Sequence, residues 1–468
     1  MKLLRISLYL ISASFIIAAP SSAQPGFLIP FMPEVGTSIQ YRPSVLPTNS
    51  YFFSLPVLPV TDTRIVNSGL DYQEAHMVTS SGMYLNLDKL FAKLQPMNTL
   101  GVNQQLDVVD IGIKAGKGYF SMNLSHRFDF TFLYTDDFMN LLYKGNGTYI
   151  GENVNLSRCG LDASHYWDIG FGYTRKLNDH FTAGFRVKRL IGLDNISTSI
   201  QSLTATTMEN DYTLQLSSNT VVNTCSPLLG NNGPAADLNG ISGISDYLMG
   251  SGNGGWGANI GLSYQPVEKL VLSFDALDIG KITWKSVPVN YHLDRGVYSF
   301  SGVSLNQLLS QDVDSVSYLD SLASSFPTTE TNQRYTTTLP STLMLSTQYS
   351  LTASTVATMS FRGTLFQQQF LPSFMMMLHQ RIGNFFAVSM NYSYQYNHVS
   401  SIGAGAYLRI GVVNLFLLTD NLTGTLYPLS GKTSHINFGI LFGSPVKAKK
   451  QRAPKAFEKN PPEPQERY

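Results

Sequence analysis

Several stretches of this chain alternate regularly between apolar residues and polar or small ones. In residues 386–396 the apolar side chains fall on one parity, and Ala, Ser, Asn and Gln fall on the other. Because successive side chains of a strand point to opposite faces, this pattern predicts a strand with one apolar and one polar face. The same period of two occurs in residues 119–134, 167–174 and 256–265.

The connections between these stretches alternate between short and long. Short ones lie at 115–118, 175–180, 265–269, 350–354, 381–384 and 411–412, and long ones at 136–163, 191–255, 287–338 and 420–434. Outer-membrane barrels combine short periplasmic turns with long outer loops. We therefore expect an all-β fold: a closed antiparallel up-and-down transmembrane β-barrel of about 14 strands. Helical spacing predicts short helices in the outer loops at 85–94, 137–143 and 304–326.

Outside the barrel domain, which we place at residues 51–443, three segments have their own character. Residues 1–23 read as a signal peptide, with a charged start, an apolar stretch and small residues at its end. Residues 24–50 are apolar and Pro-rich without a strand pattern, which fits either a plug in the lumen or a linker. Residues 444–468 are rich in Lys and Pro and predict a disordered basic periplasmic tail.

Composition supports the membrane interpretation. Charged residues make up 13% of the chain and aromatic residues 12%, against about 25% charged residues in a typical soluble domain. No apolar stretch after the signal peptide is long enough for a membrane helix. We expect a protein of the outer membrane of a Gram-negative bacterium, with both termini in the periplasm. Its expected partners are outer-membrane lipids and the barrel assembly machinery. The net charge of +1 conceals a body that is acidic once the signal peptide and the basic tail are left out, which does not favour nucleic acid.

Charged residues on the polar parity of the strands are expected to face the lumen. If the interior is filled, these residues would pair with one another and make the barrel rigid. If the interior is open, they would line a selective permeation path. They are Asp110, Lys114, Arg127, Asp129, Asp168, Arg186, Lys188, Asp275, Lys281, Lys285, Arg362 and Arg409.

The sequence contains no motif that points to catalysis, a cofactor or a metal. The eight histidines have no metal-ligand spacing, and Ser and His residues are abundant without indicating a triad, so we do not expect an enzyme. Cys159 and Cys225 both fall in expected outer loops. They form either a disulfide, which we favour, or two unpaired thiols.

Five motifs in one order resemble a family of uncharacterised Bacteroidota outer-membrane barrels, domain of unknown function 5723. They begin at Tyr84 (YLNLDKL), Lys117 (KGYFS), Gly160 (GLDASHY), Gly172 (GYTRKLND) and Asp278 (DIGKITWK). The resemblance extends over residues 41–442 and implies a relative of fatty-acid-transporter-like barrels and of gliding and type IX secretion barrel subunits. It supplies no functional residue. Where those relatives often have Asn-Pro-Ala, this chain has Arg42-Pro43-Ser44.

Two functions therefore stay open after the sequence. The first is transport of a hydrophobic compound through a porin-like barrel, with apolar loop helices as the collecting surface. The second is a non-enzymatic anchor or scaffold for a surface-protein assembly or secretion complex, bound to other surface or periplasmic proteins.

Overall fold

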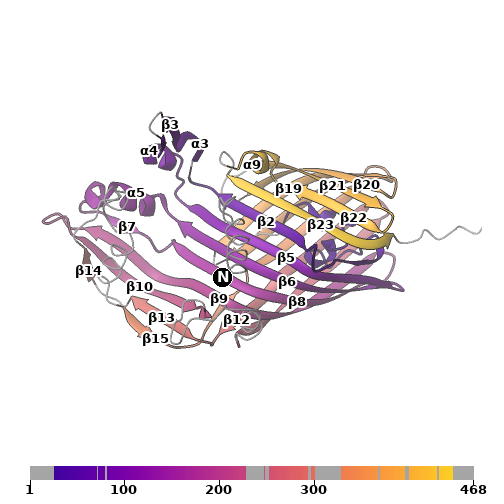
Figure 1. The fold of residues 1–468 in the computed structure, drawn as a ribbon, viewed down its shortest axis with the longest axis horizontal. Coiled ribbons are helices and arrows are strands. Elements are labelled where there is room, and N and C mark those ends of the chain that lie inside the picture. Colours follow the sequence, from indigo (N-terminus) through magenta and orange to yellow (C-terminus); the bar gives the residue numbers. More distant parts are fainter. Residues whose placement is uncertain are drawn as a thin grey trace, which may run out of the picture.

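The computed structural model describes residues 26–70, 72–79, 82–227, 247, 252–293, 297–300, 328–366, 369–395, 400–428 and 432–445. Over these residues the chain forms a closed antiparallel β-barrel of 14 strands, as the alternating pattern predicts. The barrel fills the right half of Figure 1, and several strands continue from it into a sheet on the left.

The first barrel strand is divided into β1 (Asn49–Phe53) and β2 (Val60–Asn67). Both pair with the last strand on one edge and with β5 on the other, which closes the barrel. The other strands follow in chain order: β5 (Asn98–Ala115), β6 (Gly118–Tyr134), β8 (Gly160–Lys176), β9 (Phe181–Thr207), β11 (Gly254–Val267), β12 (Leu270–Trp284), β17 (Ser341–Ser350), β18 (Thr355–Phe366), β19 (Gln369–Ile382), β20 (Phe386–Gln395), β21 (Ser400–Ile410), β22 (Val413–Thr419) and β23 (Thr433–Pro445).

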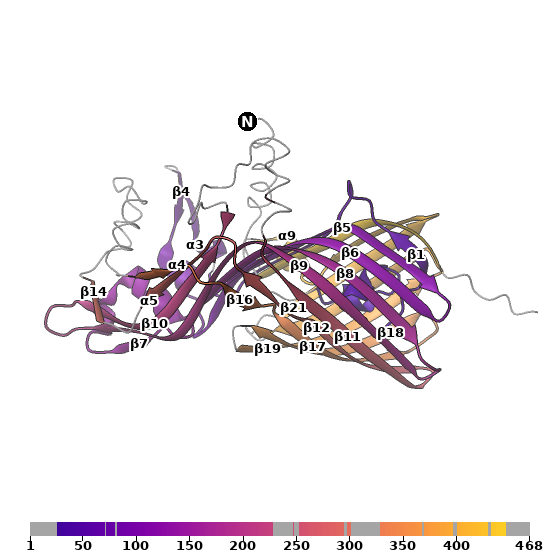
Figure 2. The ribbon, with the colours of Figure 1, turned by 90° about the horizontal axis from the view of Figure 1, so that it is seen from below.

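The sheet beyond the barrel is built on the distal half of β9, which pairs with β10 (Leu214–Cys225). Figure 2 shows it projecting from the barrel on the side opposite β1. Its other strands are β7 (Asn153–Asn155), β13 (Pro288–Leu293), β14 (Val297–Phe300) and β15 (Thr329–Thr331). Strand β16 (Tyr335–Thr338) pairs with the end of β12. A separate hairpin pairs β3 (His76–Thr79) with β4 (Gly82–Leu85).

The helices of the described residues are short. Two of them lie before the first strand, η1 (Ile29–Phe31) and α2 (Ser38–Tyr41). The others lie in connections: α3 (Tyr72–Ala75), α4 (Leu87–Phe91), α5 (Asp136–Lys144), η2 (Asn146–Tyr149) and α9 (Leu422–Leu426). Among the described residues, no helix is both long and apolar enough to span a membrane.

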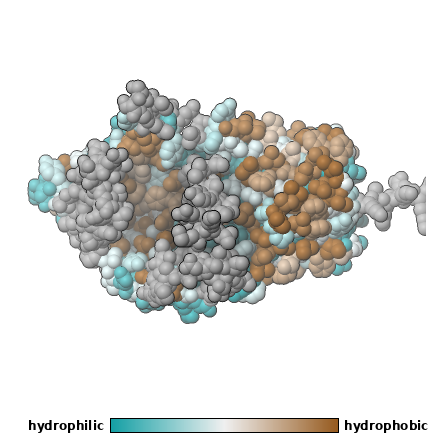
Figure 3. Space-filling model, viewed as in Figure 1, coloured by the Kyte–Doolittle hydropathy of each residue, from teal (hydrophilic) through white to brown (hydrophobic). Residues whose placement is uncertain are grey.

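The two faces of the wall differ as the alternation requires. Inward positions are mostly buried and polar or small, and outward positions are large, apolar and exposed. The outward belt includes Phe120, Phe171, Phe185, Leu262, Phe274, Leu345, Phe361 and Met390. Figure 3 shows hydrophobic residues gathered over the barrel half of the molecule. A continuous exposed apolar belt of this kind matches a lipid-facing wall.

One β-bulge overturns part of the predicted inward set. Between the pairs Ala258–Ile279 and Ile260–Ala276, β12 contains one residue more than β11. The extra residue reverses the parity of the rest of β12, because side chains alternate with a period of two. Lys281 and Lys285 are therefore exposed rather than buried in the lumen.

Two expected connections also need correction. Much of the expected loop 191–255 is strand, since β9 runs without a break to Thr207 and pairs along its distal half with β10. Strands β13 to β16 likewise lie within the expected connection 287–338. Expected helices at 85–94 and 137–143 correspond to α4 and α5, whereas the expected helix at 304–326 falls entirely outside the described residues.

The favoured disulfide was wrong, because Cys159 and Cys225 are both free and buried. Cys159 packs with Tyr134 and Val154 in one apolar cluster, and Cys225 packs with Trp284 in another. The fold places the two cysteines in different clusters. Burial raises the pKa of the Cys159 thiol, which lies between β7 and β8.

We predict two free thiols per chain. The folded protein in detergent should react slowly with a maleimide reagent, because both thiols are buried and only the thiolate is nucleophilic. The same sample denatured without reductant should bind two maleimides by intact mass. A mass with no bound maleimide under denaturing conditions would contradict the arrangement of these two cysteines.

Candidate functional site in the lumen

The lumen is occupied by the N-terminal segment, residues 26–48, which we call the luminal segment. It starts beside Asp420, at the end of the barrel with long connections, and leads into β1, where Asn49 pairs with Pro445 at the end with short turns. The segment therefore runs along the lumen. Its buried apolar side chains, which include Phe27, Leu28, Ile29, Phe31, Met32, Val35 and Ile39, form one cluster with inward residues of the wall.

This apolar cluster supplies the main attraction between the luminal segment and the barrel. Wall residues such as Tyr119, Met344, Met375 and Leu418 are buried against it. Fully burying one such apolar side chain contributes about 1.5–3 kcal/mol. Several large side chains are buried together here, so the segment packs as a core and not as a loose strand.

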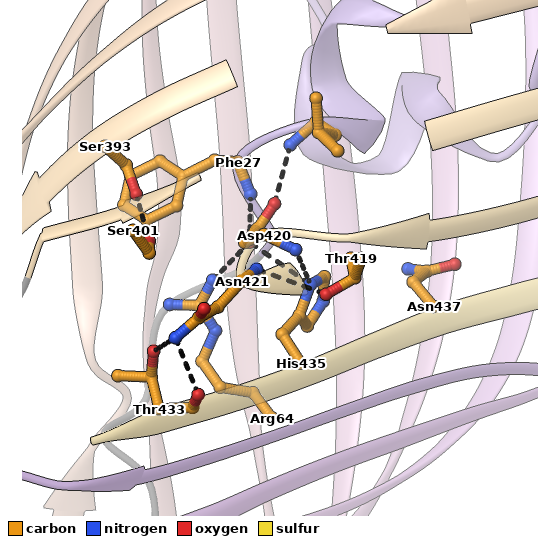
Figure 4. Close-up of polar contacts among 12 residues, drawn as sticks. Phe27, Arg64, Ser393, Ser401, Thr419, Asp420, Asn421, Thr433, His435 and Asn437 are labelled. Carbon is orange, nitrogen blue, oxygen red and sulfur yellow. Dashed lines mark hydrogen bonds and ion pairs between the residues drawn. The ribbon is translucent and has the colours of Figure 1, made fainter. Parts of the chain in front are cut away.

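Asp420 anchors the beginning of the luminal segment (Figure 4). Its carboxylate accepts hydrogen bonds from the backbone N–H groups of Phe27, at 2.7 Å, and Leu28, at 3.2 Å. Arg64 forms an ion pair with the same carboxylate. Burial opposes ionisation of Asp420, which lies between β22 and α9, but the charges of His435 and Arg64 and the bond from Phe27 outweigh it and lower its pKa. The carboxylate is thus held charged against the segment.

Arg362 and Arg64 complete this first anchor at the ring of Phe27. The guanidinium groups lie 4.6 Å and 5.2 Å from the centre of the Phe27 ring. Arg362 also donates a hydrogen bond of 3.1 Å to the carbonyl oxygen of Gly26. Cations stacked on an aromatic face are attracted to it, the more so where water is excluded.

The tripeptide Arg42-Pro43-Ser44 forms a second anchor. Ser44 donates to the Asp275 carboxylate through its backbone N–H, at 3.0 Å, and through its hydroxyl, at 2.8 Å. Arg42 donates to Ser273 Oγ at 2.8 Å, and its Nε lies 3.9 Å from Asp275. The tripeptide that departs from the resembled pattern is therefore itself bonded to the wall.

A charged network lines the lumen beside the luminal segment. The Lys188 ammonium lies 3.2 Å from Asp168 and 2.5 Å from Asp278. Arg127 lies 3.6 Å from Asp168 and 3.8 Å from Asp278. Gln40 of the segment donates to Asp107 and Asp110 nearby. These charges come from neighbouring wall strands and largely compensate one another, which limits the cost of their burial.

Most of the predicted lumen-facing residues occur where the parity places them. Asp110, Asp168, Arg186, Lys188, Asp275 and Arg362 are buried in the interior. Asp129 is half-buried and accepts from Tyr166 Oη at 2.9 Å. Arg409 is half-buried at the short-turn end, where it donates to Asn414 at 2.7 Å. Lys114 pairs with the inward Tyr119 and so has the predicted parity, but it lies beside a turn at the rim of the barrel and is exposed.

A polar cavity of about 60 Å³ opens beside the charged network. Its lining includes Tyr41, Asp62, Arg64, Arg127 and Asp129. Within the described chain, the Tyr41 hydroxyl and the Arg64 Nη1 are buried without a hydrogen-bond partner. Since liquid water takes about 30 Å³ per molecule, the cavity suits a small number of waters more than a bulky solute.

Sequence reasoning missed five residues that hold this site, each for a local reason. Asp107 and Asp278 lie at β-bulges, which reverse the parity. Asp420 follows a strand in an expected outer loop, and Arg42 belongs to a segment without periodicity. Arg64 lies on β2, which the sequence does not mark clearly. The alternating Thr-Asp-Thr that directly precedes Arg64 was the sequence signal that could have placed it in a strand.

We predict that Gly261→Ala loosens the luminal segment. A Cβ at Gly261 would overlap the backbone nitrogen of Ser44 and the Asp275 carboxylate. Hydrogen exchange of residues 26–48, followed by mass spectrometry, should accelerate at least about tenfold, equivalent to about 1.4 kcal/mol.

Gly257→Ala is the matched control on the same strand, because its Cβ would meet neighbours only at ordinary distances of 3.6 Å or more. Equal exchange rates in the Gly261 variant and the control would contradict the close packing of Ser44 against β11.

Comparisons with known proteins concern the chain as a whole. A protein-family model described as a family of unknown function (DUF5723) matches residues 43–420. No curated protein matches. The Ralstonia pickettii toluene transporter TbuX is 9% identical, with a TM-score of 0.40, over 88% of this chain and 95% of that one.

Two further solved structures show a comparable likeness. The Pseudomonas putida toluene transporter TodX is 10% identical, with a TM-score of 0.40, over 91% of this chain and 95% of that one. A Pseudomonas aeruginosa FadL homologue is 9% identical, with a TM-score of 0.38, over 86% of this chain and 92% of that one.

Proposed function

The chain belongs to the family of unknown function DUF5723, and we propose, from the geometry of its lumen, that it is an outer-membrane transport barrel gated by its luminal segment. The observation that carries the proposal is how that segment is held. Its described contacts with the inner wall are apolar packing, hydrogen bonds and ion pairs. Such contacts can be released without breaking any pair of barrel strands.

The apolar belt and the two unlike ends support the proposed location. The belt would lie in the hydrocarbon layer, and the end with short turns would face the periplasm. The last described residue, Pro445, lies at that end, whereas Gly26 lies at the opposite end beside Asp420. The expectation of a periplasmic N-terminus stays a prediction, because residues 1–25 lie outside the described residues.

We propose a hydrophobic compound as the cargo. Toward the long connections, Leu190, Ile282, Trp284 and Leu339 form a buried apolar cluster, which an apolar compound would contact once these side chains move apart. Deeper in the barrel, the charged network and the luminal segment oppose its passage, because apolar groups cannot replace the partners of buried charges. Passage therefore requires the luminal segment to move.

The gate is tested by removing both carboxylate anchors. The double variant Asp275→Ala, Asp420→Ala should remove the two carboxylates that bind the luminal segment at Ser44 and at Phe27 and Leu28. It should raise the open probability of single barrels in a planar bilayer at least tenfold. The wild-type barrel should stay closed for most of the recording. Asp179→Ala is the control, because Asp179 lies in an exposed turn with Lys176.

Both outcomes are interpretable when the variant is shown to form a barrel by its shift in SDS gel mobility on heating. Equal closure of wild type and folded double variant would exclude gating by these anchors. An open double variant that takes up no hydrophobic compound would keep the gate and reject the proposed cargo.

A second function is favoured by one specific observation, the sheet of β7, β9, β10 and β13 to β15 that extends beyond the barrel. A structured surface outside the membrane suits a scaffold for other surface proteins. Purification of the tagged protein from native outer membranes separates the two functions. A near-equimolar protein partner would support the scaffold, whereas a retained hydrophobic molecule without such a partner would support transport.

A further inference from the structure

Two histidines meet on the outside of the barrel wall, away from the lumen. His126 of β6 and His165 of β8 lie on neighbouring strands, and their Nε2 atoms are 2.6 Å apart. The two rings are nearly perpendicular, with an interplanar angle of 82°. The ring of Trp167 contacts His126 at a centroid distance of 4.9 Å. The spacing of the two histidines along the sequence does not predict that their imidazole rings are in contact.

Asp194 orients His165 from behind. Its Oδ2 lies 3.0 Å from His165 Nδ1, on the opposite side of the ring from Nε2. The Ser226 hydroxyl donates to Asp194 Oδ1 at 2.7 Å, and the Tyr247 hydroxyl donates to Oδ2. A carboxylate held in this way keeps the proton of a neutral imidazole on Nδ1. The lone pair of His165 Nε2 is then directed toward His126.

An imidazole that is bonded to a carboxylate through one nitrogen and exposes a lone pair on the other is arranged as in metal-ligating histidines. Ligating histidines almost always donate their second ring N–H to a carboxylate or carbonyl group, which fixes the tautomer and raises the basicity of the ligand nitrogen. We propose that His126 and His165 bind a divalent transition metal of the zinc class through their Nε2 atoms, with Asp194 as the positioning residue behind His165.

The geometry needs only a small adjustment. A zinc ion with bonds of about 2.0–2.1 Å at a tetrahedral angle separates two ligand nitrogens by roughly 3.3 Å. The two rings would move apart by less than about 1 Å, which a side-chain rotation on adjacent strands supplies. The His165 side chain is 20% exposed, so the pair is not sealed inside the wall.

The proposed site is open. Among the described residues, no group of three or more His, Cys, Asp and Glu side chains is placed to hold a metal ion. Two imidazoles therefore supply the protein ligands, and water or an incoming donor fills the other positions. Imidazole suits zinc, copper and nickel better than calcium or magnesium, whose preferred ligands are oxygens. The site is independent of the proposed transport function.

The test uses the full-length protein, folded in detergent and stripped with a chelator, titrated with ZnCl₂ in a calorimeter. We expect one site in the wild type and loss of that site in His126→Gln and in His165→Gln. Asp194→Asn should weaken binding 10- to 100-fold, the usual effect of losing such a partner. His180→Gln, in an exposed turn, should bind like the wild type.

A second measurement on the wild type guards against misfolded variants. Zinc should protect His126 and His165, but not His180, from diethyl pyrocarbonate, with the modified residues identified by mass spectrometry. Calcium at the same concentration should not protect them. The proposal is overturned if the wild type binds no zinc, if the folded histidine variants bind it equally well, or if zinc leaves the modification of both histidines unchanged.

Discussion

The whole structure depends on satisfying backbone hydrogen bonds in a wall that faces lipid. In hydrocarbon an unpaired N–H or C=O group costs several kcal/mol, so a sheet can cross only if it closes on itself. Here closure comes from β23, which pairs with β1 and β2, while these pair with β5. Once the sheet is closed, the period of two directs every side chain either to lipid or to the lumen. Side chains toward lipid must be apolar, whereas polar side chains toward the lumen need partners.

In this barrel the luminal segment fills the lumen and packs against the inward side chains of the wall. Small inward residues such as Gly184 and Gly261 let the backbone of the luminal segment approach the wall closely. Apolar packing of that segment then lies next to a network of buried charges centred on Lys188, Asp168 and Asp278. Buried ion pairs add little net stability but are costly to break one at a time, so they fix the position of what they touch more than they strengthen it. This property suits the gate that we propose for the luminal segment.

Outside the wall, the same strands produce a different kind of site. His126 and His165 belong to the outward parity, as do the belt residues Phe120 and Phe171 of the same two strands. Their pairing depends on the register of β6 against β8, and Asp194 reaches His165 at a bulge between β8 and β9. Position in the sheet, and not spacing along the chain, therefore creates this cluster.

The sequence by itself determined the barrel, since its alternation, its connection lengths and its scarcity of charge all follow from a wall between lipid and a polar interior. It also determined most of the inward charges, such as Asp168, Lys188 and Arg362, because these depend only on parity within one strand. Only the tertiary structure decided where β-bulges reverse the parity of a strand. These reversals place Lys281 outside the lumen and Asp107 and Asp278 inside it. The tertiary structure also placed the luminal segment and kept the two cysteines apart. A bulge adds a single residue to one strand of a hydrogen-bond ladder, and this leaves the alternation of the sequence unchanged. Contacts such as Phe27 with Asp420 join residues 393 positions apart, so no local sequence pattern predicts them.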